Sequence, residues 1–189
     1  AQIEDSDAPP AKPIGMDEHP MFVSMINQAQ ALVVLEKVVS SAESPVKAFI
    51  SAAGSPLPEL ANSNKMRELF GKMEFTVAID LFMTETAQMA DVVLPSSAWA
   101  EKDGTYSSTE RRVQRIRKAV CAPGQAKDDW QILTSLANSM GANWQYACAK
   151  DIMQEINANT ASYKGITYAR IEEAGLHWPC PTPEHPGPP

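Results

Sequence analysis

The sequence predicts an α/β fold built on a doubly wound, mainly parallel sheet, with irregular tails. Three short apolar runs rich in branched residues support this prediction, at residues 46–52, 75–79 and 92–94. Such runs are typical of strands that are buried on both faces of a parallel sheet. Buried helix is the competing interpretation, but Asp80 and Pro95 end the last two runs too soon for long helices.

The segments between these runs have the features of helices. Residues 60–73 predict a helix with Asn62 or Ser63 as its N-cap, and residues 84–90 predict one or two turns capped by Thr84. Right-handed strand–helix–strand crossovers would then give the parallel sheet. Further helices are expected at residues 22–39, 128–141 and 151–157. The 128–141 helix should turn five residues to the core: Trp130, Leu133, Leu136, Ala137 and Met140.

The turn signal Asp103-Gly104 precedes two segments that could pair as a hairpin, at residues 105–109 and 113–120. The expected domain organisation is a linker or arm at residues 1–20, an α/β dinucleotide-binding domain at 21–145 and a helical and irregular extension at 146–189. With 189 residues and 44% hydrophobic content, the chain can bury a real core.

Composition excludes several functional classes. The net charge of −7 argues against a general nucleic-acid binder. No apolar run approaches the ~20 residues of a transmembrane helix, and the start has no signal-peptide pattern. Since the first residue is Ala rather than Met, we expect a processed or excised chain.

The three cysteines, Cys121, Cys148 and Cys180, form no Cys-x-x-Cys pair, so we expect neither an iron–sulfur cluster nor a zinc site in this chain. Free thiols favour a reducing, cytoplasmic location, with the periplasm left open. We find no Ser-His-Asp set and no paired catalytic carboxylates, so no catalytic residue or metal ligand is predicted.

The candidate binding residues lie where the predicted strands end, because ligands of open α/β sheets bind outside the carboxyl ends of the strands. A carboxylate at Asp80 could accept two hydrogen bonds from guanine N1–H and N2–H. The hydroxyls and free N–H groups around Thr84, Glu85 and Thr86 could bind ribose or phosphate. After the first strand, Gly54 and Ser55 form either a plain turn or a close backbone approach to a ligand.

One long stretch, TETAQMADVVLPSSAWAEKDGTYSSTERRVQR at residues 84–115, resembles the signature of the large catalytic subunits of molybdopterin oxidoreductases. The resemblance covers roughly residues 46–187. Its tail, ASYKGITYARIEEAGLHWPCPTPEHPG, is most similar to formate dehydrogenase. Because those subunits are several times longer, the resemblance implies a fragment or a split subunit.

The resemblance implies a fold of the formate dehydrogenase and DMSO reductase type, and a molybdopterin guanine dinucleotide cofactor with molybdenum or tungsten. The cofactor would be bound jointly with domains that this chain lacks. The implied cofactor-binding residues are Gly54, Ser55, Asp80, Thr84, Glu85, Thr86, Asp103, Arg111, Arg112 and Gln114. The chain departs from the family pattern at Ser55, where Asn is usual. It departs again at Tyr106-Ser107-Ser108, where Phe-x-Asn is usual, so the asparagine contact is either lost or made by Ser108.

The implied activity is oxidation of formate to carbon dioxide, with two electrons passing to iron–sulfur centres in partner regions. The implied partners are the remaining domains of the catalytic chain and electron-transfer subunits. Nitrate reduction is the enzymatic alternative. A non-catalytic scaffold that docks partner subunits is the alternative outside catalysis, and a truncated product that is unstable alone is the third.

Overall fold

A computed structural model describes residues 35–36, 39–41, 46–60 and 62–188, which divide into two compact units between Ser96 and Ser97. The first unit ends at Ser96 and the second begins at Ser97, and each is described by itself. This boundary lies inside the 21–145 stretch that the sequence assigned to one α/β domain. The expected 1–20 arm and most of the expected 22–39 helix fall outside the described residues.

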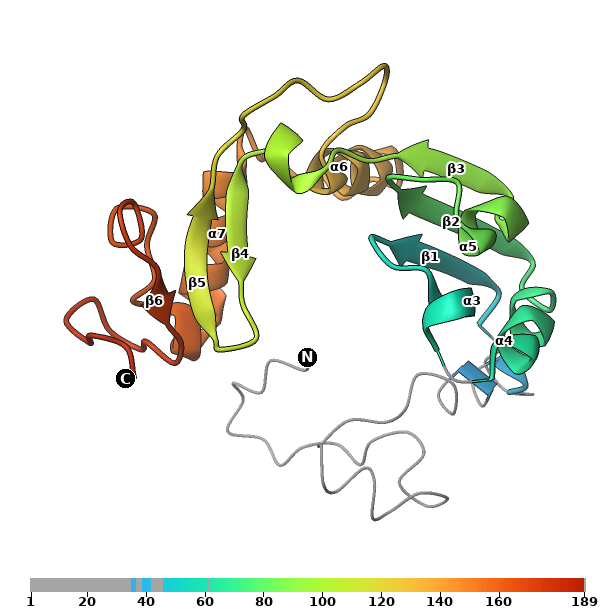
Figure 1. Ribbon diagram of the computed structural model, residues 1–189, viewed down its shortest axis with the longest axis horizontal. Coiled ribbons are helices and arrows are strands. Elements are labelled where there is room, and N and C mark those ends of the chain that lie inside the picture. Colours follow the sequence, from blue (N-terminus) through green and yellow to red (C-terminus); the bar gives the residue numbers. More distant parts are fainter. Residues whose placement is uncertain (1–34, 37–38, 42–45, 61, 189) are drawn as a thin grey trace, which may run out of the picture. The chain divides into compact units, whose positions relative to one another are not determined.

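The first unit contains a three-stranded parallel sheet in the order β1-β2-β3 (Figure 1). The strands are β1 (Ala48–Ala52), β2 (Phe75–Asp80) and β3 (Val92–Pro95). Ile50 of β1 is level with Val77 of β2, which is level with Val92 of β3. The three apolar runs are therefore strands, and the expected parallel α/β sheet is confirmed.

Three helices connect these strands: α3 (Pro56–Glu59), α4 (Ser63–Phe70) and α5 (Glu85–Met89). Asn62 caps α4 by accepting a hydrogen bond from the Lys65 N–H group, and Thr84 caps α5 through the Ala87 N–H group. The Thr84 cap was predicted, and Asn62 was one of the two caps predicted for α4. Helix α3 was not predicted, although a proline at its first position favours a helix start.

The core of the first unit lies between the helices and one face of the sheet. It consists of Leu35, Leu57, Met66, Leu69 and Phe70. The ring of Phe70 meets that of Phe49 in β1 edge to face, with 5.1 Å between ring centroids. This contact anchors α4 on the first strand.

The second unit has an antiparallel sheet in the order β4-β5-β6 (Figure 1). Its strands are β4 (Gly104–Ser107), β5 (Arg112–Ile116) and β6 (Leu176–His177). A tight turn joins β4 to β5, in which the Arg111 N–H group donates to the Ser108 carbonyl over 2.9 Å. The predicted hairpin is confirmed, with arms that end earlier than expected.

Helices α6 (Asp129–Ser139) and α7 (Ala149–Asn159) and the short 3-10 helices η1 (Trp99–Glu101) and η2 (Ala161–Tyr163) complete this unit. Its core consists of Val113, Met153, Ile166, Ile171 and Cys180. No helix in the described part of the chain is long and apolar enough to span a membrane.

The predicted inward stripe of α6 is wrong at two positions. Met140 is 81% exposed because the helix ends at Ser139 and Met140 is already its C-cap residue. Leu133 is 36% exposed, whereas its neighbour Ile132 is buried. Successive residues are about 100° apart around a helix, so burying Ile132 turns Leu133 outwards.

Candidate functional site

Asp80 is the last residue of the central strand of the parallel sheet and is half-buried. One carboxylate oxygen, Oδ1, accepts a hydrogen bond from the Leu81 N–H group over 2.7 Å. The other, Oδ2, accepts one from the Thr84 hydroxyl over 3.1 Å. Among the described residues, Asp80 forms no ion pair. Since a carboxylate offers about four lone-pair sites, each oxygen can accept one further hydrogen bond.

These contacts make Asp80 a suitable acceptor for a ligand edge with two N–H donors. The carboxylate is oriented by its own loop, and its charge is not neutralised by a neighbouring cation in the described chain. It lies at the carboxyl end of its strand, the end outside which ligands of open α/β sheets generally bind. The residues present therefore fit the guanine base that the sequence predicted for this position.

The turn after β1 lies next to Asp80, because Ala52 is level with Ile79 in the sheet. Ala53 adopts a left-handed conformation with φ of 54°, and its N–H group bonds the Ile79 carbonyl over 2.9 Å. The N–H groups of Gly54 and Ser55 have no acceptor among the described residues. Because Gly54 is half-buried and Ser55 is buried, the Gly54 N–H group is the more accessible of the two to a ligand.

Two of the predicted site residues, Ser55 and Thr86, are buried. Their hydroxyls bond each other over 2.9 Å, and the Thr86 hydroxyl also accepts from the Leu57 N–H group over 3.3 Å. These hydroxyls join α3 to α5 inside the unit and do not face solvent. The carboxylate of Glu85, a third predicted residue, is exposed and pairs with Arg67 over 2.6 Å.

Sequence reasoning missed the apolar residues 81–83, which directly follow Asp80 and are called the 81–83 loop below. The exposed fractions are 47% for Leu81, 76% for Phe82 and 61% for Met83. A signal was present in the sequence, because three large apolar residues stand where a strand has ended and a polar turn would be usual.

The remaining predicted residues lie in the second unit, spread along its hairpin. Arg111, in the turn, has φ of 69° and places its guanidinium over the Trp178 ring, 5.7 Å from the centroid. Arg112 donates to the Glu110 carboxylate over 2.8 Å, and this hydrogen bond lowers the pKa of Glu110. Gln114 is exposed on β5, opposite Tyr106.

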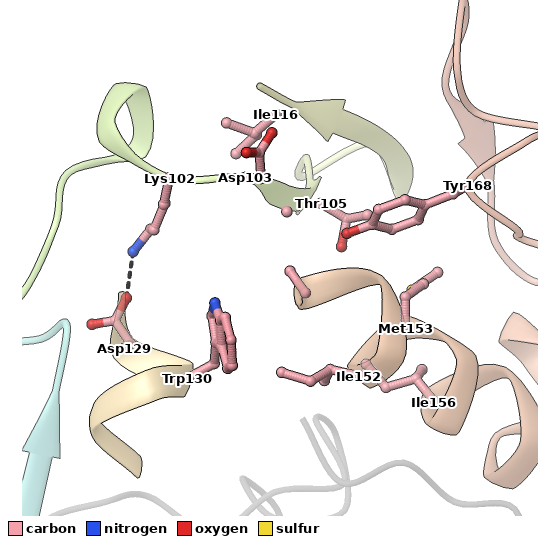
Figure 2. A pocket seen from close by; sticks show the side chains of 12 residues that line it. Lys102, Asp103, Thr105, Ile116, Asp129, Trp130, Ile152, Met153, Ile156 and Tyr168 are labelled. Atoms are coloured by element: carbon pink, nitrogen blue, oxygen red, sulfur yellow. Dashed lines mark hydrogen bonds and ion pairs between the residues drawn. The ribbon is translucent and has the colours of Figure 1, made fainter. Parts of the chain in front are cut away.

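Asp103, the last predicted residue, lines a cavity of about 240 Å³ in the second unit (Figure 2). Ile116, Ile152, Met153 and Ile156 supply apolar walls, and Lys102 pairs with Asp129 at one edge. The buried Tyr168 hydroxyl, also at this cavity, has no hydrogen-bond partner in the described chain. Burial raises the pKa of Tyr168, so its hydroxyl stays protonated at neutral pH.

The structure thus brings Gly54, Asp80 and Thr84 together at one end of the parallel sheet. In the second unit, Asp103 lines the cavity described above, whereas Gln114 lines another of about 510 Å³ together with Trp99 and Tyr106. Arg111 and Arg112 line neither of these two cavities. In the described part of the chain, no group of three or more His, Cys, Asp or Glu side chains is placed to bind a metal ion.

Comparison with known proteins gives three findings. The family model "Molybdopterin oxidoreductase" matches residues 20–139. The F420-dependent formate dehydrogenase 1 subunit alpha of Methanococcus maripaludis is 42% identical over 154 residues, which cover 80% of this chain and 23% of that protein. The assimilatory nitrate reductase catalytic subunit of Bacillus subtilis is 39% identical over 149 residues, 75% of this chain and 21% of that protein.

A solved structure, the acetylene hydratase from Pelobacter acetylenicus, matches with a TM-score of 0.62 and 24% identity. The match covers 78% of this chain and 20% of that one. This likeness concerns the fold. The chain spans about a quarter of the length of the formate dehydrogenase subunit it matches.

Proposed function

Because the chain belongs to the molybdopterin oxidoreductase family, we propose that it binds one guanine dinucleotide arm of a bis-pterin cofactor in a formate dehydrogenase. The cofactor would contain molybdenum or tungsten and would be bound jointly with the rest of a longer protein. The chain's own role in this proposal is to bind and orient the cofactor.

The observation that carries the proposal is the state of Asp80. Its carboxylate is oriented by Leu81 and Thr84 and has no cationic partner in the described chain. A carboxylate at the carboxyl end of a parallel strand matches the two adjacent donors, N1–H and N2–H, on the edge of guanine. Adenine has no such pair of donors, so the same arrangement would favour guanine.

The other first-unit residues support this contact in different ways. The N–H group of Gly54 would donate to a phosphate or ribose oxygen. Thr84 orients the Asp80 carboxylate through its hydroxyl. The buried Ser55 and Thr86 hydroxyls fix the spacing of the turn after β1 and helix α5, so we assign them a positioning role.

In the second unit, Arg111 and Arg112 would bind the pyrophosphate or the pterin, because a planar guanidinium makes paired hydrogen bonds to such groups. Gln114 and Asp103 would contribute polar contacts. Arg112 already shares a hydrogen bond with Glu110 and Arg111 lies over Trp178. Both are thus partly oriented without a ligand.

When bound, the metal-containing cofactor supplies the redox chemistry that converts formate to carbon dioxide, a proton and two electrons. The electrons would leave through iron–sulfur centres in partner regions or subunits. The family resemblance and the 42% identity to a formate dehydrogenase subunit support formate as the substrate.

Nitrate reduction is the second candidate activity. It is favoured by the 39% identity to a nitrate reductase catalytic subunit, which is nearly as high as the identity to the formate dehydrogenase. Both activities would use the same nucleotide-binding role for this chain. Assay of the purified assembly with formate and with nitrate distinguishes them.

The nucleotide-binding role is tested by Asp80→Asn, which keeps the size of the side chain and removes its charge. We expect the variant assembly to lose most of its cofactor while the unit stays folded, because the amide loses acceptor capacity towards the two guanine donors. The measurement is mass spectrometry of guanine-containing pterin released from native material.

Glu74→Gln is the matched control. Glu74 lies just before the amino end of the same strand, exposed and paired with Lys47. The control should keep wild-type cofactor content. Equal cofactor content in Asp80→Asn and wild type would contradict the proposed role of Asp80, and absence of any guanine-containing pterin from the native assembly would favour the scaffold alternative.

A further inference from the structure

The 81–83 loop is apolar and exposed, and hydrogen bonds hold its backbone in place. Its three apolar side chains are largely exposed, with Phe82 the most exposed at 76%. Exposed apolar residues that stand singly need no explanation, but three in succession commonly mark a binding surface.

Hydrogen bonds hold the backbone of the 81–83 loop at both of its ends. At the start, the Leu81 N–H group donates to Asp80 Oδ1 over 2.7 Å. At the end, the Thr84 N–H group donates to the Phe82 carbonyl over 2.9 Å, and the Gln88 side chain donates to the Met83 carbonyl over 3.2 Å. Apolar packing therefore does not determine the shape of the loop; hydrogen bonds do.

The loop exposes the ring of Phe82 two positions along the chain from Asp80, whose carboxylate can accept further hydrogen bonds. A ligand that satisfies both features needs N–H donors on one edge and a flat π face. A purine base has both. A purely apolar partner would leave the half-buried Asp80 charge unpaired on binding, which is costly, and a simple phosphate has no π face to cover the ring.

We propose that Phe82 is the stacking platform for the guanine base whose edge Asp80 binds, and that the two together bind a guanine nucleotide without the pterin or the metal. The inference rests on the proposed function and deepens it. Stacking supplies affinity that does not depend on which base is bound, while the carboxylate supplies the preference for guanine.

The experiment is calorimetric titration of the 189-residue chain with GMP and, separately, AMP. We expect saturable GMP binding in the millimolar range or tighter, and weaker binding of AMP. Phe82→Ala should weaken GMP binding by about 5- to 150-fold, the usual effect of removing one aromatic platform. Phe82→Trp should restore it, because any aromatic ring can stack.

Met89→Ala is the matched control, since Met89 is another exposed apolar side chain, at the far end of α5. It should leave GMP binding unchanged. If Phe82→Ala binds GMP like the wild type while Asp80→Asn is weakened, the stacking inference fails and the proposed function stands. If wild-type chain shows no saturable GMP binding, the claim of binding without pterin or metal is overturned.

Should the isolated variants fail to fold, the same comparison is made in the assembled enzyme by measuring retained guanine nucleotide after dialysis. Phe82→Ala should then retain less than Met89→Ala and wild type. Equal retention in all three, with a loss in Asp80→Asn, overturns the role of Phe82 alone. Equal retention that includes Asp80→Asn overturns the proposed function as well.

Discussion

At the scale of single residues, the buried Thr86 hydroxyl accepts the Leu57 N–H group and bonds the Ser55 hydroxyl. Thr86→Val keeps the shape of the side chain but removes the hydroxyl, so the Ser55 hydroxyl and the Leu57 N–H group lose their hydrogen-bond partner. Because an unsatisfied buried polar group costs about 1–3 kcal/mol, we expect the free energy of unfolding to fall by that amount. Urea denaturation followed by circular dichroism measures it.

Thr109→Val is the control for this substitution, since Thr109 is exposed in the turn between β4 and β5. It should change the free energy of unfolding by less than about 0.5 kcal/mol, as surface substitutions usually do. If Thr86→Val and wild type are equally stable, solvent reaches the Ser55 hydroxyl and the Leu57 N–H group in the folded protein. The Thr86 hydroxyl would then again be a candidate contact for a ligand.

The position of a residue in the fold could be predicted where the neighbouring sequence alone determines it. Asp80 follows an apolar run, so its place at the end of a strand could be read directly. The burial of Thr86 could not, because it depends on Ser55 and Leu57 at the start of the four-residue helix α3, which lie 31 and 29 residues earlier in the chain. Phe82 was not singled out, because the sequence does not show that hydrogen bonds hold its loop with the ring exposed.

At the scale of elements, Asp91 ties the start of β3 to β2. Its Oδ2 atom accepts from the Thr76 N–H group over 2.7 Å and from the Thr76 hydroxyl over 2.9 Å. The N–H hydrogen bond, followed by that of the hydroxyl, lowers the pKa of Asp91 below its ordinary value of about 4. The folded state therefore binds this proton less readily than the unfolded state does.

This depressed pKa fixes the sign of a pH effect. The stabilisation from Asp91 is fully present above about pH 4 and is lost as the pH falls through the lower folded-state pKa. Asp91→Asn has no carboxylate to titrate. We expect wild type to be more stable than Asp91→Asn at neutral pH and the difference to shrink below about pH 4.

Urea denaturation between about pH 6 and about pH 3 measures the difference. Thr109→Val, which alters no ionisable group, should differ from wild type by an amount that does not change with pH. A gap between wild type and Asp91→Asn that stays constant with pH would mean that the Thr76 hydrogen bonds do not depend on the charge of Asp91.

Elements whose limits depend on local chemistry were well predicted. The three strands, the α5 cap at Thr84 and the hairpin follow from apolar runs, a capping threonine and turn residues. Helix α6 shows where local rules stop. Its existence followed from Asp128 and Gly141, but which side is buried depends on tertiary packing, and that selected Ile132 over Leu133.

At the scale of the whole molecule, the division between Ser96 and Ser97 was not predicted, because no glycine-rich or charged linker marks it. Each unit has its own buried cluster, one around Leu69 and the other around Ile166. The predicted site residues are divided between the two units. The sequence could therefore name the proposed site residues but could not describe a cavity that they share.

Two separate cores predict unfolding that differs between spectroscopic probes. All four tryptophans, at positions 99, 130, 144 and 178, lie in the second unit. Tryptophan fluorescence therefore reports the second unit, whereas far-ultraviolet circular dichroism reports both. We expect the two urea unfolding curves not to coincide, because coincidence of probes is the mark of a single cooperative transition.

Core substitutions assign each transition to its unit. Leu69→Ala and Ile166→Ala each remove a fully buried branched side chain, which costs about 2–5 kcal/mol in a packed core. Leu69→Ala should shift the circular dichroism transition and leave the fluorescence midpoint in place, while Ile166→Ala should shift the fluorescence midpoint. If both variants shift both transitions equally, the two cores unfold as one cooperative structure. Cofactor loss in Asp80→Asn would then have two explanations, namely lower stability of the whole fold and loss of the guanine contact.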